Sequence, residues 1–134
     1  MPPRVRLVVA VLFATLLAAG CSPRQPEPAP AGTGNGPVIE QLRAAGSDLA
    51  RPHVLEFYSY FPTRADADRA AKVLAGRGYR TEVDGPDDDA EWQLLAMRES
   101  LVTEAKVDAL EVEVAQAATQ ANGYYDGWEA AVVE

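Results

Sequence analysis

Few side chains in this chain combine a reactive group with neighbours that would support catalysis. The sequence has one cysteine, Cys21, and one histidine, His53, so it cannot build a zinc constellation or a useful Cys–His pair. A Ser–His–Asp arrangement would need His53 itself, and no G-x-S-x-G elbow is present. His53 follows Pro52 just ahead of an apolar run, a setting more typical of a surface or strand-edge residue. The sequence therefore predicts a protein that is not an enzyme.

The acidic residues also give little indication of a bound metal ion. Asp84 and the run 87–89 could offer carboxylate oxygens to calcium, which prefers such ligands. The run lacks the D-x-D-x-D-G spacing and the trailing glutamate of a calcium loop, and we interpret it as a solvated hairpin tip. Gly76-Arg77-Gly78 ends a helical pattern instead of opening one, so it is not a phosphate loop. No metal or cofactor is expected.

The first 20 residues have the composition of an export signal. Two arginines precede an apolar core, residues 7–19, that only Thr15 interrupts. This core of about 13 residues is too short to span a membrane, for which about 20 are needed. Small residues follow it up to Gly20. The pattern predicts a signal peptide over residues 1–20, with cleavage between Gly20 and Cys21.

Cys21 is the residue to which that signal leads. The segment Leu17-Ala18-Ala19-Gly20-Cys21 resembles the bacterial lipobox, whose cysteine thiol takes a diacylglycerol and fatty acids such as palmitate. One departure is that the large aliphatic residue lies four places before the cysteine instead of three. The resemblance implies a lipoprotein that is lipidated at Cys21 and anchored outside the cytoplasm, on the periplasmic face of the outer membrane or at the cell surface. An ordinary cleaved signal and a wrongly assigned start remain the alternatives.

Residues 21–37 differ in composition from the chain on either side. They are rich in proline and glycine and lack large apolar residues, so we interpret them as a flexible tether with a reach of roughly 50 Å. Residues 38–134 are long enough for one small domain. Without residues 1–20, the chain has 10 basic and 20 acidic side chains, a net charge near −10. Such a charge opposes direct binding to nucleic acid.

The folded part alternates between helical and strand periodicity. We expect a short leading helix over 38–49, strands over 54–61, 79–84, 91–98 and 124–133, and longer helices after Thr63 and after Thr103. Thr63, with Asp66 three places later, resembles a capping box, and Asp126-Gly127 suggests a bulge in the last strand. This order predicts an α+β, ferredoxin-like βαββαβ sandwich with a leading N-terminal helix.

The strand over 54–61 carries large side chains on both of its faces. We assign Leu55, Phe57 and Phe61 to the core beneath the helices, because strand residues alternate between faces. Glu56, Tyr58 and Tyr60 then lie on the opposite face. Either the leading helix covers that face, or it is a docking surface of the kind that tyrosine and tryptophan favour. Trp92 or Trp128 is expected to share it, so the candidate partner-binding residues are Tyr58, Tyr60, Trp92 and Trp128.

Five short motifs follow one another along the domain: Gly46-Ser47-Asp48-Leu49, Arg51-Pro52, the run from Phe57 to Thr63, Gly78-Tyr79 and the run from Tyr125 to Glu129. In order and spacing they resemble the regulator of ribonuclease E activity B (RraB) family. The resemblance covers about Val38 to Val133. It implies a ferredoxin-like fold and a non-catalytic protein that binds ribonuclease E and restrains its cleavage of RNA. It assigns no role to a single residue.

The N-terminal segment and the folded domain indicate different cellular compartments. Ribonuclease E works in the cytoplasm, whereas a lipobox sends the domain across a membrane. The first hypothesis is an exported, lipid-anchored binding domain whose protein partner is unidentified. The second is a cytoplasmic inhibitor of ribonuclease E whose N-terminal segment only looks like a signal. A small-ligand-binding lipoprotein is a third, which the absence of any ligand constellation disfavours.

Overall fold

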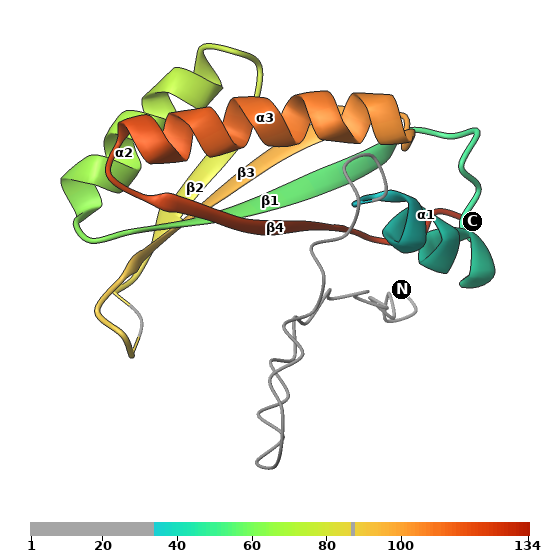
Figure 1. The fold of residues 1–134 in the computed structure, drawn as a ribbon, viewed down its shortest axis with the longest axis horizontal. Helices are drawn as coiled ribbons and strands as arrows, with labels where there is room; N and C mark the ends of the chain where they lie inside the picture. The colour runs from blue at the N-terminus through green and yellow to red at the C-terminus, as the bar shows by residue number, and fades with distance from the viewer. Residues whose placement is uncertain (1–33, 87) are drawn as a thin grey trace, which may run out of the picture.

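Seven helices and strands form the part of the chain that the structure describes. A computed structural model gives residues 34–86 and 88–134 (Figure 1). The elements are α1 (Gly36–Ala44), β1 (His53–Phe61), α2 (Arg64–Ala75), β2 (Arg80–Asp84), β3 (Trp92–Ser100), α3 (Glu104–Gln120) and β4 (Tyr124–Ala130). The expected signal peptide, Cys21 and most of the expected tether lie outside the described residues. Because α1 begins at Gly36, the last residues assigned to the tether by composition belong to the fold.

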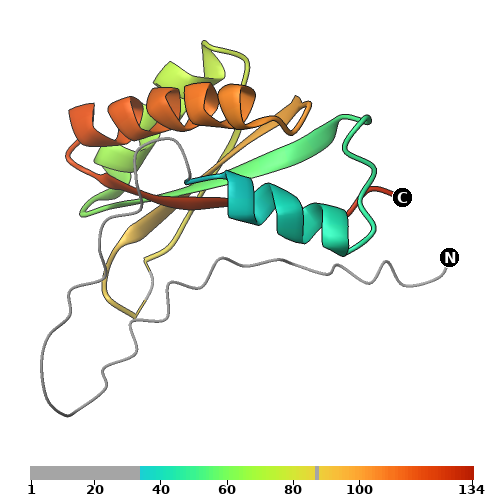
Figure 2. The same cartoon turned by 45° about the vertical axis from the view of Figure 1, so that its right-hand side comes forward.

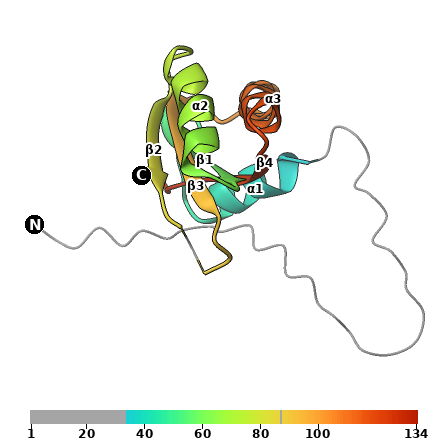
Figure 3. The same ribbon diagram turned by 90° about the vertical axis from the view of Figure 1, so that its left-hand side faces the viewer.

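The strands form one antiparallel sheet in the order β2-β3-β1-β4. Helices α2 and α3 lie side by side on one face of this sheet, and α1 lies beyond its β4 edge (Figure 1, Figure 3). Every residue of β1 is paired with β3, and β4 lies on the other side of β1. This is the ferredoxin-like α+β sandwich that the alternation of periods predicted, with the expected leading helix.

The core lies between the sheet and the two long helices. Leu55, Phe57 and Phe61 alternate along β1 and are at most 1% exposed, which confirms the predicted core set. Small residues on α2 and apolar residues on α3 complete the core, among them Ala67, Ala70, Leu74, Val107 and Val114. The buried side chains of α1, Val38, Ile39 and Leu42, join this same cluster.

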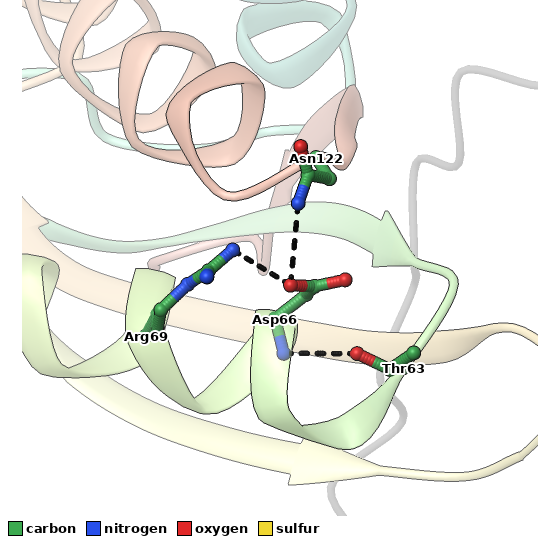
Figure 4. Close-up of polar contacts among 4 residues, drawn as sticks. All are labelled: Thr63, Asp66, Arg69 and Asn122. Carbon is green, nitrogen blue, oxygen red and sulfur yellow. Dashed lines mark hydrogen bonds and ion pairs between the residues drawn. The ribbon is translucent and has the colours of Figure 1, made fainter.

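The N-terminus of α2 is fixed to the turn that precedes β4. Thr63 caps the helix, because its Oγ1 accepts a hydrogen bond of 3.1 Å from the Asp66 backbone N–H (Figure 4). The Asp66 carboxylate does not close the expected capping box; it accepts hydrogen bonds from Arg69 at 2.6 Å and from Asn122 Nδ2 at 3.4 Å (Figure 4). Asn122 has a φ of 64°, a left-handed conformation that asparagine tolerates better than most residues. These contacts hold together the two chain reversals at one end of the sheet.

Candidate functional site

The sheet face opposite α2 and α3 is covered by no helix within residues 34–86 and 88–134 (Figure 2, Figure 3). We call it the open face and define it by the side chains that the strand registers bring together: Glu56, Tyr58, Tyr60, Gln93, Leu95, Met97, Tyr124 and Glu129. Most of them are partly exposed, and Tyr124 is 48% exposed. The alternative in which the leading helix covers this face is wrong, since α1 lies beyond the β4 edge and adds its buried residues to the core.

Three tyrosines on the open face are held in fixed positions. The Tyr58 hydroxyl donates a hydrogen bond to Glu129, and the Tyr124 hydroxyl donates one of 2.8 Å to Glu91 Oε2. Gln93 Nε2 donates to the Tyr60 hydroxyl at 3.2 Å, and the Tyr60 and Tyr124 rings lie 5.7 Å apart. Because their positions are already restricted, these side chains would lose little conformational freedom on binding.

Burial and neighbouring carboxylates raise the pKa of two of these hydroxyls. Burial, followed by the hydrogen bond to Glu129, raises the pKa of Tyr58 above its ordinary value. The hydrogen bond to Glu91, followed by burial, raises the pKa of Tyr124 to about 12. Tyrosine is already neutral and able to donate in the physiological range, and a raised pKa extends this form to higher pH. The open face therefore presents neutral phenols beside negatively charged carboxylates.

Both tryptophans lie on the helix side of the sheet, so the expectation that one of them shares the face with Tyr58 and Tyr60 is wrong. Trp92 pairs with Phe61 and Trp128 pairs with Phe57 in the strand registers, and paired residues point to the same side. Trp92 packs against the core beneath the Arg64 guanidinium, whose carbon lies 5.6 Å from its ring centroid. Trp128 is 6% exposed.

A β-bulge explains the placement of the β4 side chains. The register with β1 shifts between Tyr58 and Ser59, so that Tyr58 is paired with Gly127 and Ser59 with Tyr125. The extra residue reverses the alternation, and as a result Tyr125 and Trp128 both face the core while Tyr124 faces outward. Tyr124 is the open-face tyrosine that the sequence analysis missed. The only signal for it was the Asp126-Gly127 bulge, whose consequence depends on the pairing partner.

Asn35 secures the start of the fold to α3 and β4. Its Nδ2 donates hydrogen bonds to Asp108 Oδ1 at 2.5 Å and Glu111 Oε2 at 2.6 Å, and its Oδ1 accepts one from the Trp128 indole at 2.8 Å. The Tyr125 hydroxyl donates to the other oxygen of Glu111 at 2.6 Å, and burial raises the pKa of Tyr125. The polar atoms of this junction are bonded to one another, which indicates a structural role.

His53 is buried, so the expectation that it lies at the surface is wrong. It is 1% exposed and lies on the core side at the start of β1. Its Nδ1 lies 2.9 Å from the Arg51 carbonyl oxygen, and its Nε2 lies 2.5 Å from Ser47 Oγ. The Ser47 oxygen also accepts a 3.0 Å hydrogen bond from the Val133 backbone N–H. These contacts are satisfied when Nδ1 donates to the Arg51 carbonyl and Nε2 accepts from the Ser47 hydroxyl, and they tie the loop after α1 to Val133.

The open face is strongly acidic. In addition to Glu56 and Glu129, the registers place Glu82, Asp84 and Glu99 on this side of the sheet, and Arg80 is the one basic residue that they place there among the described positions. Several of the domain's other basic residues belong to α2, on the opposite face of the sheet (Figure 3). Neither of the two described stretches contains a group of three or more histidine, cysteine, aspartate or glutamate residues that could hold a metal ion. The described helices also include none long and apolar enough to cross a membrane.

A family model described as regulator of ribonuclease activity B matches residues 33–130. The match includes every helix and strand of the described fold, and it extends over more than half of the chain. No curated protein sequence matches the chain. The match thus covers the whole ferredoxin-like fold. The chain belongs to the regulator of ribonuclease activity B family.

Proposed function

We propose that this protein is a non-catalytic regulatory domain that binds its protein partner through the open face. Membership of the family supports a regulatory, protein-binding role. We choose this surface because three tyrosines are held in position on a sheet face that no described helix covers. Tyrosine contributes a large contact area at a small entropic cost and is enriched where binding energy is concentrated.

We propose that the isolated domain binds ribonuclease E. Only its membership of the family supports this choice of partner. We expect the soluble chain 22–134, mixed with purified ribonuclease E from the same bacterium, to slow cleavage of a fluorogenic RNA several-fold at micromolar concentrations. The net negative charge of the chain opposes binding to RNA, so we expect the chain to act on the enzyme and not by sequestering the substrate. An unchanged cleavage rate, together with no binding to the enzyme in calorimetry, would reject ribonuclease E as the partner.

We further propose that the protein is exported and anchored in a membrane through lipid on Cys21. This proposal is supported by the charged, apolar and small-residue pattern of residues 1–20 and by the lipobox resemblance. An exported copy would not meet cytoplasmic ribonuclease E, so its partner in the cell would be another protein. A cytoplasmic location would favour the alternative, in which the chain is an inhibitor of ribonuclease E in the cell.

Metabolic labelling with a fatty-acid analogue tests the anchor. We expect label on the wild-type chain and none on Cys21→Ala, because the thiol is the acceptor of the lipid. Immunoblotting of both variants controls for expression, and fractionation should move the unlabelled variant out of the membrane. If the wild-type chain is expressed and carries no label, the protein is not a lipoprotein and the cytoplasmic alternative is favoured.

A further inference from the structure

Tyr79 shows how this fold combines a tyrosine, a carboxylate and an arginine. The Tyr79 hydroxyl donates a 2.7 Å hydrogen bond to Glu113 Oε2. The guanidinium carbon of Arg98 lies 5.2 Å from the centroid of the Tyr79 ring, and its Nη1 lies 3.9 Å from the same Glu113 oxygen. One arginine thus contacts the ring face and the carboxylate together. A planar cation is suited to this arrangement, since it can stack on the ring while its N–H groups face the acid.

The open face repeats the tyrosine–carboxylate part of this arrangement twice. Tyr58 is bonded to Glu129, and Tyr124 is bonded to Glu91. Over the described residues, the arginine–ring contacts are those of Arg98 with Tyr79 and of Arg64 with Trp92, and both lie on the helix side of the sheet. The two outer tyrosines therefore present their rings to a cation that another molecule would supply, and Glu129 lies beside the Tyr58 ring.

Charge and apolar surface on the open face favour the same kind of ligand. Glu82 on β2 and Glu99 on β3 lie on the same side of the sheet as the tyrosines, whereas Arg80 is the one base that the registers place there among the described strand positions. The resulting potential attracts cations and repels acidic or phosphate-bearing ligands. Leu95 lies between Tyr58 and β2 and is partly exposed, so it can contact the methylene groups of a long basic side chain, whereas Met97 is buried beneath Arg80.

We propose that the open face binds an arginine-bearing, extended segment of a partner protein, with one guanidinium group placed over Tyr58 and facing Glu129 and another placed over Tyr124. This inference rests on the proposed function, because it assigns a chemistry to the same docking surface. Arginine is preferred to lysine, since a guanidinium stacks on a ring and bonds a carboxylate in one geometry, whereas an ammonium acts as a hydrated point charge.

Two labelled twelve-residue peptides test the inference by fluorescence anisotropy. One has arginine at alternate positions between glycines, and the other has lysine at the same positions. We expect the soluble chain 22–134 to bind the arginine peptide at least about three-fold more tightly than the lysine peptide, which is the order of one exposed cation–π contact. Tyr124→Leu should weaken arginine-peptide binding about three-fold or more, whereas Tyr124→Phe, which keeps the ring, should weaken it less.

Matched charge variants separate a specific site from general attraction. Glu129→Gln and Glu40→Gln each remove one negative charge, but Glu40 is an exposed residue of α1, away from the open face. We expect a loss of about three- to ten-fold for Glu129→Gln and less than about two-fold for Glu40→Gln. Circular dichroism should show that both variants remain folded. Equal losses for the two variants, or equal affinities for the two peptides, would overturn the inference.

The peptide result and the ribonuclease result can fail separately. If open-face substitutions abolish binding of ribonuclease E but the arginine peptide does not bind, the inference is wrong and the proposed docking surface stands. If the peptide binds as expected but open-face variants still bind ribonuclease E normally, the arginine chemistry stands and the proposed docking of that enzyme on this face is wrong.

Discussion

The double variant Tyr58→Ala/Tyr60→Ala is expected to bind ribonuclease E about 100-fold more weakly than the wild-type chain, and to lose its effect on RNA cleavage in parallel. A hot-spot tyrosine that becomes buried in an interface contributes on the order of 2 kcal/mol to the free energy of binding. Two such residues together account for at least this loss of affinity. Both rings lie on the open face, where the hydrogen bond that Tyr58 donates to Glu129 and the one that Tyr60 accepts from Gln93 already restrict their positions. Calorimetric titration of the soluble chain 22–134 measures the change.

Loss of folding must be separated from loss of binding in this variant. Tyr58 and Tyr60 are only partly buried, so we expect the free energy of unfolding to fall by no more than about 1 kcal/mol for each. Val112→Ala is a matched control, because Val112 is 55% exposed and belongs to α3, on the other side of the sheet. Wild-type affinity in the folded double variant would show that the open face is not the docking surface for this enzyme.

Trp128→Ala is expected to lower the free energy of unfolding by about 3–5 kcal/mol, the usual cost of removing a buried large aromatic side chain. The indole is 6% exposed, packs in the core cluster, and donates a 2.8 Å hydrogen bond to Asn35 Oδ1. Its loss opens a cavity and also releases the start of the fold from β4. Because small domains are stable by only about 5–15 kcal/mol, this loss is a large fraction of the free energy of unfolding.

Trp128→Phe separates the hydrogen bond from the packing. It retains most of the aromatic volume and leaves Asn35 Oδ1 without its indole donor, for an expected cost of about 1–3 kcal/mol. Urea unfolding followed by far-ultraviolet circular dichroism measures both variants. A loss below about 1 kcal/mol for Trp128→Ala, accompanied by weaker partner binding, would return Trp128 to the surface role that the sequence alone suggested.

The fold could be predicted from the sequence because local patterns determine it. The alternation of Leu55, Phe57 and Phe61 with Tyr58 and Tyr60 sets the two faces of β1, and that assignment is confirmed by their burial. Helical spacing then supplies two apolar stripes, and right-handed crossovers leave few arrangements of four strands. Each of these signals lies within a short stretch of chain, so no knowledge of distant partners was needed.

The details that the sequence did not predict depend on partners far along the chain. The faces of Tyr124 and Trp128 follow from a bulge that only the pairing with β1 locates. His53 is buried because Ser47 and the Arg51 carbonyl satisfy its ring nitrogens. Periodicity and composition cannot identify such hydrogen-bond partners. The open face combines side chains from three strands. Only its residues on β1 could therefore be predicted from the sequence.

Site-specific photo-crosslinking in living cells tests most directly whether the open face is the docking surface. A photoreactive amino acid would replace Tyr124 in one variant and Val112 in another; these side chains are 48% and 55% exposed and lie on opposite sides of the sheet. We expect a discrete crosslinked protein from position 124 that is absent at position 112 and lost in the Tyr58→Ala/Tyr60→Ala background. A crosslink at position 112 and none at position 124 would place the partner on the helical face and contradict the account.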